Sequence, residues 1–152
     1  MRKLLLAGGL ALLMVVAVPT TGLATPPEVL FMEAHGSLDP TVTATWSSTG
    51  AIADSGIDEV DGSILTGFEN PGNVTFHDFD TTRIGEHGSF SIRRQSILKD
   101  VDGPILRFED RWVIVAGTGA YAGAHGHGTG ITSVNLATGE IVGMDSGEVH
   151  FD

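Results

Sequence analysis

From residue 25 onward, hydrophobic and polar side chains alternate with a period of two wherever a period can be recognised. This alternation is typical of β-strands with one buried face. The strand-like segments are 29–35, 41–46, 89–93, 108–114, 134–136 and 142–144, and the last two flank a tight turn at 137–140. A hydrophobic stripe with the 3.6-residue period of a helix is not found after residue 24. The pattern therefore predicts an all-β chain.

The number and positions of the glycines indicate that these strands are sharply bent. Eighteen glycines lie among the 128 residues from 25 to 152, and many fall inside the strand segments instead of at turns. Such glycines permit the sharp bends that a small closed sheet needs. We expect a closed antiparallel β-barrel of about eight strands, calycin-like in architecture, with an open sandwich as the alternative. Residues 54–82 are richest in turn formers, and within them 73–79 is either a strand or a lid.

The first 24 residues have the pattern of a secretory signal peptide. Arg2 and Lys3 precede an apolar run over 4–18, and the small residues at 22–24 fit a cleavage site. The run is shorter than the roughly 20 residues that span a bilayer, so no stable membrane anchor is expected after cleavage. This pattern predicts a secreted, extracellular domain over 25–152. The chain has no cysteine, so that domain would be held together without disulfides.

The net charge of the chain bears on the kinds of molecule that it could bind. From residue 25 onward, nineteen acidic side chains face six lysines and arginines, which gives a formal net charge of −13. Nucleic-acid binding requires a basic surface that neutralises phosphates, and the sequence has no such stripe. We therefore expect no nucleic-acid partner, and we interpret the acidity as a source of solubility.

The segment 113–130 resembles a dinucleotide-binding fingerprint in its spacing of glycines. That fingerprint requires a helix directly after the glycines, because the pyrophosphate binds at the helix N-terminus. Here further glycines follow, and each would cost a helix about 1 kcal/mol relative to alanine. The segment therefore predicts a turn between strands, and no cofactor is expected.

Two histidines in this segment, His125 and His127, would share one face of a strand and raise the possibility of a metal site. Cupin barrels, which use a His-x-His pair for metal, add a glutamate within a few residues. Here the next carboxylate is Glu140. We interpret the two histidines as surface residues and expect no metal.

Residues 116–126, Ala-Gly-Thr-Gly-Ala-Tyr-Ala-Gly-Ala-His-Gly, resemble a turn between two late strands in the allene oxide cyclase and dirigent barrels. The pattern there is Gly-Gly-(Thr/Ser)-Gly-x-aromatic-x-Gly-(Ala/Val)-x-Gly, and this chain departs from it at the first position. The matching glycines are Gly117, Gly119, Gly123 and Gly126, and they suit a tight reversal with positive φ or close backbone approach. Tyr121 occupies the aromatic position.

This resemblance implies an eight-stranded barrel, often a homodimer or homotrimer, with an apolar cavity at one mouth. Relatives in that superfamily enclose a small hydrophobic molecule there and steer its cyclisation or coupling without a cofactor. The physical basis is confinement, since the cavity holds a reactive geometry and excludes water. The expected function is binding of a small hydrophobic molecule and its cyclisation or isomerisation. The alternative is a non-catalytic binding or structural module whose barrel is filled by its own side chains.

The resemblance also directs attention to particular residues. A family cyclase carries a glutamate on its first strand, and Glu33 lies on the first strand here, with Val29 and Phe31 on the same face. If that face is internal, burial would raise the pKa of Glu33 and suit it to proton transfer; otherwise Leu30, Met32 and Ala34 form the core. Tyr121 is a second catalytic candidate or a core anchor. Candidate ligand-binding residues are His35, Trp46, Phe90, Arg94 and Trp112, of which the aromatic ones, with Phe108, could line a cavity or fill it.

Overall fold

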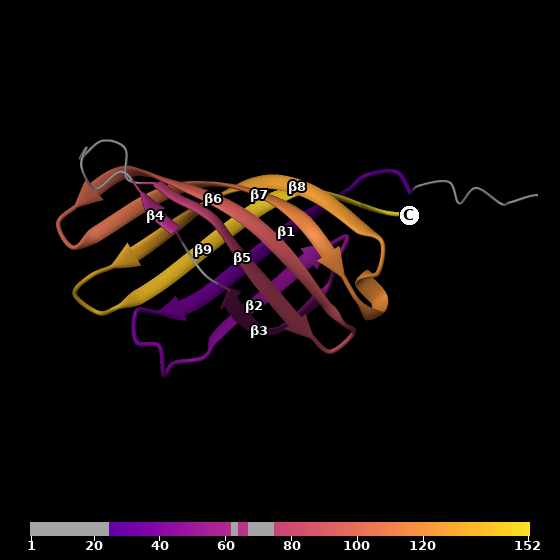
Figure 1. The fold of residues 1–152 in the computed structure, drawn as a ribbon, viewed down its shortest axis with the longest axis horizontal. Helices are drawn as coiled ribbons and strands as arrows, with labels where there is room; N and C mark the ends of the chain where they lie inside the picture. Colours follow the sequence, from indigo (N-terminus) through magenta and orange to yellow (C-terminus); the bar gives the residue numbers. More distant parts are fainter. Residues whose placement is uncertain (1–24, 62–63, 67–74) are drawn as a thin grey trace, which may run out of the picture.

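The computed structural model describes residues 25–61, 64–66 and 75–152, and within these the chain is almost entirely β-structure (Figure 1). The predicted signal peptide over 1–24 and the first two residues of 73–79 lie outside this part of the chain. The described elements, in order, are β1 (Glu28–Ser37), β2 (Ala44–Gly50), β3 (Asp54–Asp61), β4 (Ile64–Thr66), β5 (Thr75–Gly85), β6 (Ser89–Asp102), β7 (Ile105–Gly117), the 3-10 helix η1 (Gly119–Tyr121), β8 (Ala124–Asn135) and β9 (Glu140–Phe151).

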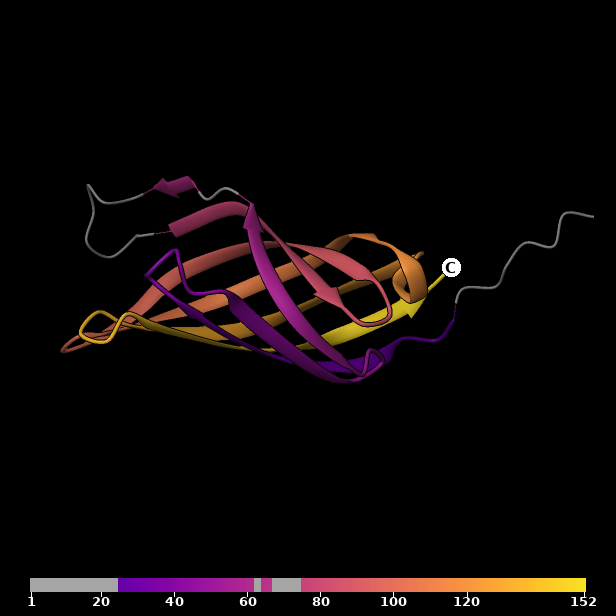
Figure 2. The same cartoon turned by 90° about the horizontal axis from the view of Figure 1, so that it is seen from below.

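The sheet closes on itself. Its strands follow the order β3-β2-β1-β9-β8-β7-β6-β5-β4, all neighbours are antiparallel, and a further pairing of β3 with β5 joins the two sides. The strands run obliquely around a common axis (Figures 1 and 2). The predicted closed antiparallel barrel of about eight strands is thereby confirmed, and the open sandwich is excluded. Closure removes the unpaired edges that β3 and β5 would otherwise expose.

The segment 54–82, which the sequence marks as the least regular, contributes β3, β4 and most of β5 in its described residues. Asp61 of β3 pairs with Asp80 of β5, and Ile64 of β4 pairs with His77 in the same register. Strands β3 and β4 therefore pair with successive parts of β5, and β4 continues the line of β3. Of the two interpretations of 73–79, the strand holds from Thr75 onward.

Strand β2 begins later than the alternation over 41–46 predicts. Asp39 accepts hydrogen bonds from the backbone N–H of Thr41 (2.9 Å) and from its hydroxyl (2.7 Å). This local side-chain turn competes with strand pairing, as short polar side chains often do. The strand starts at Ala44, three residues after the predicted position.

One half of the barrel is filled by an apolar core. Its buried side chains come from β1, β2, β6, β7, β8 and β9, from the β2–β3 connection and from η1: Leu30, Met32, Trp46, Ile52, Phe90, Ile92, Trp112, Ile114, Tyr121, Ala124 and Val149. The Phe90 ring packs edge-on against the rings of Trp46 and Tyr121, with ring centroids 5.3 and 5.5 Å apart, respectively. Gly128 and Gly147 leave room for the Trp112 indole, which a Cβ at either position would strike. This explains why glycines interrupt β8 and β9.

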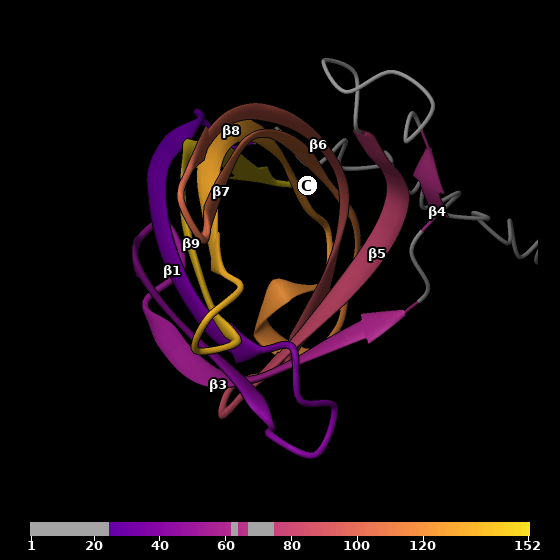
Figure 3. The same ribbon diagram turned by 90° about the vertical axis from the view of Figure 1, so that its left-hand side faces the viewer.

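The glycine-rich turn closes this end of the barrel. Gly117 ends β7, Gly119 opens η1, Gly123 directly precedes β8, and Gly126 lies near the start of β8. Gly119 has φ of +60°, and a Cβ there would lie 2.5 Å from the carbonyl oxygen of His87. The turn places the Tyr121 ring in the core, and η1 is visible at the far end in Figure 3. In the described part of the chain, no helix has the length and apolar character needed to cross a membrane.

Candidate functional site

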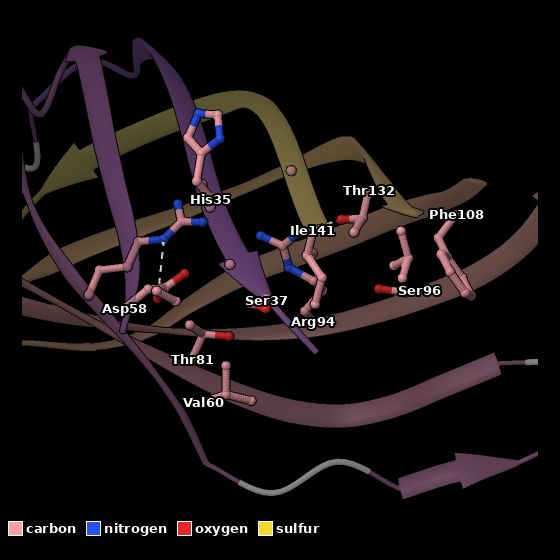
Figure 4. A pocket seen from close by; sticks show the side chains of 16 residues that line it. His35, Ser37, Asp58, Val60, Thr81, Arg94, Ser96, Phe108, Thr132 and Ile141 are labelled. Carbon is pink, nitrogen blue, oxygen red and sulfur yellow. Dashed lines mark hydrogen bonds and ion pairs between the residues drawn. The ribbon is translucent and has the colours of Figure 1, made fainter. Parts of the chain in front are cut away.

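The other half of the barrel contains a cavity of about 260 Å³. Ser37, Val134 and Ile141 line it next to the β1–β2 and β8–β9 hairpins, so it opens toward this end of the barrel. The same end faces the viewer in Figure 3. The wall is mostly apolar and comprises Ala34, Ala44, Val60, Phe108, Val134 and Ile141. Side chains from β3, β5, β6 and β8 add polar groups to it: Asp58, Thr81, Arg83, Arg94, Ser96 and Thr132 (Figure 4).

A buried ionic cluster separates this cavity from the apolar core. Arg94 donates through Nη1 to Asp110 at 3.0 Å and through Nη2 to Asp145 at 2.5 Å. Thr132 donates its hydroxyl to the same Asp110 oxygen at 2.5 Å. The three charged side chains are at most 6% exposed, so their charges are screened far less than those of surface pairs.

Arg83 extends the cluster to a second wall of the barrel. Its Nη2 lies 3.4 Å from Asp145, and its Nη1 lies 2.6 Å from the sulfur of Met32. Its Nε faces Asp58 at 3.8 Å, which is an ion pair but too long for a hydrogen bond. Five ionisable side chains from β3, β5, β6, β7 and β9 thus meet inside the barrel: Asp58, Arg83, Arg94, Asp110 and Asp145.

The cluster is not fully satisfied by the protein. Asp58 Oδ1, Arg83 Nε and Arg94 Nε are buried without a hydrogen-bond partner among the described residues, and all three side chains border the cavity. Burial raises the pKa of Asp58 above its ordinary value, and the nearby Arg83 and Arg94 oppose this rise without cancelling it. Unpaired buried polar atoms are costly, so they indicate where a bound molecule would be stabilised.

Glu33 and His35 lie on the outer face of β1. Their side chains are 48% and 53% exposed and hydrogen-bond each other at 3.0 Å. Leu30 and Met32 are buried in the core, and Ala34 lines the cavity. The interpretation that placed the Glu33 carboxylate in the lumen is therefore wrong, because the face of β1 that points into the barrel is the one with Leu30, Met32 and Ala34. His35 borders the cavity at the rim, but its ring contacts Glu33 on the outside.

The aromatic candidates divide between the two halves of the barrel. Trp46, Phe90 and Trp112 belong to the apolar core and do not border the cavity, so their assignment as cavity-lining residues is corrected. Phe108 does line it. Arg94 points inward, as its candidate role requires, while its neighbour Arg93 pairs with Asp80 on the surface at 3.0 Å.

Tyr121 is anchored in the closed end, away from the cavity. Its hydroxyl donates a short hydrogen bond to Asp54 Oδ2, a carboxylate that also accepts the backbone N–H of Ser55. The Tyr121 bond, with backbone hydrogen bonds, holds the pKa of Asp54 well below its ordinary value. Burial, reinforced by Asp54, raises the pKa of Tyr121 far above the physiological range. This geometry favours the core-anchor interpretation of Tyr121 over a catalytic phenol.

The histidine pair lies on the outer face of β8. His125 stacks on His150 with ring centroids 5.6 Å apart, and its Nε2 lies 3.0 Å from Asp152. His127 pairs in register with Glu148. Over residues 25–61, 64–66 and 75–152, no group of three or more histidines, cysteines, aspartates or glutamates is arranged to hold a metal ion.

Four residues of the ionic cluster were missed by sequence reasoning: Asp58, Arg83, Asp110 and Asp145. One of them left a usable signal, because Asp110 alternates with Phe108, Trp112 and Ile114, and a carboxylate in an apolar stripe is rarely buried without a partner. Asp145 lies between glycines, and Asp58 and Arg83 lie in polar strands, so neither the burial nor the pairing of these three could be recognised in advance.

The fold and the site together define a closed eight-stranded antiparallel barrel with one packed half and one open half. Comparison with family models, with curated proteins and with solved structures found no match.

Proposed function

We propose that this protein is a secreted barrel that binds a small, mostly apolar molecule in the open half of its lumen. We further propose that it steers the cyclisation or isomerisation of that molecule without a cofactor. The observation that carries the proposal is the cavity of about 260 Å³ with apolar walls and unpaired polar atoms at its base. Small-molecule sites commonly combine such walls with a few orienting polar groups.

The size of the cavity limits the ligand. Its volume equals that of roughly nine water molecules at ~30 Å³ each, which is slightly below the usual range for small-ligand sites. A ligand of this size would replace water against Val60, Phe108 and Ile141 and leave its polar end at Asp58 or Arg94. Residues 116–126, which resemble the turn of allene oxide cyclase and dirigent barrels, support the same function by analogy of fold.

Asp58 takes the proton-transfer role in this proposal, in place of Glu33. A general acid or base needs a pKa displaced toward neutrality and a position within reach of the substrate. Asp58 borders the cavity and has a pKa raised by burial. The alternative function is a non-catalytic binding or structural module, and the aromatic packing of Trp46, Phe90 and Tyr121 in the closed half favours it.

The binding proposal is tested by filling the cavity. Val134 lines it, whereas Ser133, the preceding residue on β8, borders a groove on the outer surface. We expect Val134→Trp to weaken binding of cyclohexylmethanol at least ~10-fold in calorimetric titration, because the indole occupies the ligand volume. Ser133→Trp should leave the affinity unchanged. Equal affinities in the two variants would place the ligand elsewhere and reject the proposal.

A further inference from the structure

The base of the cavity holds one more carboxylate than guanidinium. Asp110 and Asp145 hydrogen-bond Arg94 at 3.0 and 2.5 Å, and Arg83 lies 3.4 Å from Asp145. Asp58 is the third carboxylate, and its ion pair with Arg83 is the longest of the cluster at 3.8 Å. The uncompensated negative charge therefore falls mainly on Asp58.

Asp58 is also the carboxylate that a ligand can reach. It borders the cavity, whereas Asp110 and Asp145 do not. Its side chain is 9% exposed, and its Oδ1 has no hydrogen-bond partner among the described residues. Figure 4 shows it on the wall of the cavity beside Thr81 and opposite Arg94. A buried acceptor in this position is stabilised by a ligand that donates a hydrogen bond.

The guanidinium groups, by contrast, are already engaged. Both terminal nitrogens of Arg94 donate to carboxylates, and those of Arg83 contact Asp145 and Met32. On each arginine only Nε has no hydrogen-bond partner among the described residues, and the terminal nitrogens beside it already contact a carboxylate or Met32. A carboxylate ligand would have to compete with these contacts for the bidentate pairing that makes arginine a good carboxylate receptor. It would also approach the charge of Asp58. An ammonium group instead brings three N–H donors and the missing positive charge.

The charge of the whole protein acts in the same direction. The chain has a formal net charge of −11, and the segments around the mouth carry Asp39, Asp102 and Glu140. The cations Lys99 and Arg107 in this region pair with Glu109 and Asp100. A negative rim raises the local concentration of cations and lowers that of anions.

We propose that the cavity takes a small apolar amine, with its ammonium nitrogen at Asp58 and its hydrocarbon body against Val60, Phe108, Val134 and Ile141. This inference rests on the proposed ligand-binding function and names its chemical class. Bound in this way, the ammonium makes the charged cluster electrically neutral. The apolar walls select for the hydrocarbon part of the ligand, and Asp58 selects for its ammonium group.

The test compares three compounds of the same shape at pH 7: cyclohexylmethylamine, cyclohexylmethanol and cyclohexanecarboxylate. Calorimetric titration of the wild-type protein should give the tightest binding for the amine, by at least ~10-fold over the alcohol, and no measurable binding for the carboxylate. This series needs no variant, so it decides the question even if a substitution at Asp58 disturbs folding.

Asp58→Asn then tests the residue. The substitution keeps the shape and leaves two carboxylates facing two guanidinium groups, so the amine should bind no more tightly than the alcohol. Glu59→Gln is the matched control, because Glu59 is an exposed carboxylate on the same strand, and it should keep the preference for the amine.

The outcomes separate the inference from the function on which it rests. Alcohol binding equal to or tighter than amine binding, or binding of the carboxylate, overturns the amine inference and leaves the cavity a ligand site. A preference for the amine that survives Asp58→Asn overturns the role of Asp58. Failure of all three compounds to bind rejects the proposed function together with the inference.

Discussion

Two aspartates four residues apart on β3 show how strongly position determines side-chain chemistry. Asp54 accepts hydrogen bonds from Tyr121 and from backbone N–H groups, and these favour its ionised form. Asp58 lies in the cavity wall without a partner for Oδ1, so burial favours its neutral form. Asp54 therefore stabilises the closed end, whereas an ionised Asp58 costs stability. Groups that cost stability are commonly retained where a protein needs them for function.

This difference predicts how stability responds to pH in Asp58→Asn. Because the folded pKa of Asp58 lies above the ordinary value of 3.8, the native state binds its proton more tightly than the unfolded state does. The stability that protonated Asp58 gives the folded state is thus fully present below pH 3.8, and it is lost as the pH rises through the raised pKa. We expect the variant to melt a few degrees above wild type at pH 8, with the difference shrinking toward pH 4.

Thermal melts of wild type, Asp58→Asn and the surface control Glu59→Gln across this range provide the measurement. The control should follow wild type at every pH. A lower midpoint for Asp58→Asn at pH 8 would mean that the ion pair with Arg83 outweighs the cost of burial, and the account of Asp58 would have to be abandoned.

At the scale of single elements, the turn between β7 and β8 is the most constrained. Gly119 has φ of +60° and faces the carbonyl oxygen of His87, while the neighbouring Ala120 is exposed within η1. We expect Gly119→Val to lower the free energy of unfolding by roughly a few kcal/mol, because a β-branched residue at positive φ is strained and crowded. Ala120→Val, the matched control, should change it little. Denaturant unfolding measures both, and equal stabilities would remove this explanation of the glycine pattern.

Most strands could be predicted from the sequence because a half-buried antiparallel strand imposes a period of two on its side chains. The segments 29–35, 89–93 and 108–114 all fall within observed strands. The start of β2 was predicted too early, since the alternating residues 41–43 are held by the turn at Asp39. The period gives the two faces of a strand but not which face is inside, and this is why the sequence left open whether Glu33 or the face with Leu30 and Met32 lies in the lumen.

The site was less predictable than the fold. Arg94 and Phe108 were among the candidates, but the partners of Arg94 are distant in sequence: Asp110 by 16 residues and Asp145 by 51. Only the closure of the barrel brings them together. The division of the aromatic residues between a packed half and an open half likewise depends on the stagger of the strands, which no single strand encodes.

At the scale of the whole molecule, the barrel has its packed core and its cavity at opposite ends. The closed end holds the aromatic core and the Tyr121–Asp54 hydrogen bond, and the open end holds the cavity with its charged base. The ionic cluster lies between them and is anchored on five strands. If the cavity binds a ligand as proposed, the packed half can maintain the fold whether or not the open half is occupied.

The central claim, that the open half of the lumen is the binding site, is tested most directly by a backbone amide NMR titration with cyclohexylmethylamine. We expect the largest saturable shifts at residues that line the cavity, such as Ala34, Asp58, Arg94, Thr132 and Ile141, and little change at Trp46, Phe90 and Tyr121 in the closed half. Shifts confined to the outer surface or to the closed half, or no saturable shifts at all, would contradict the claim.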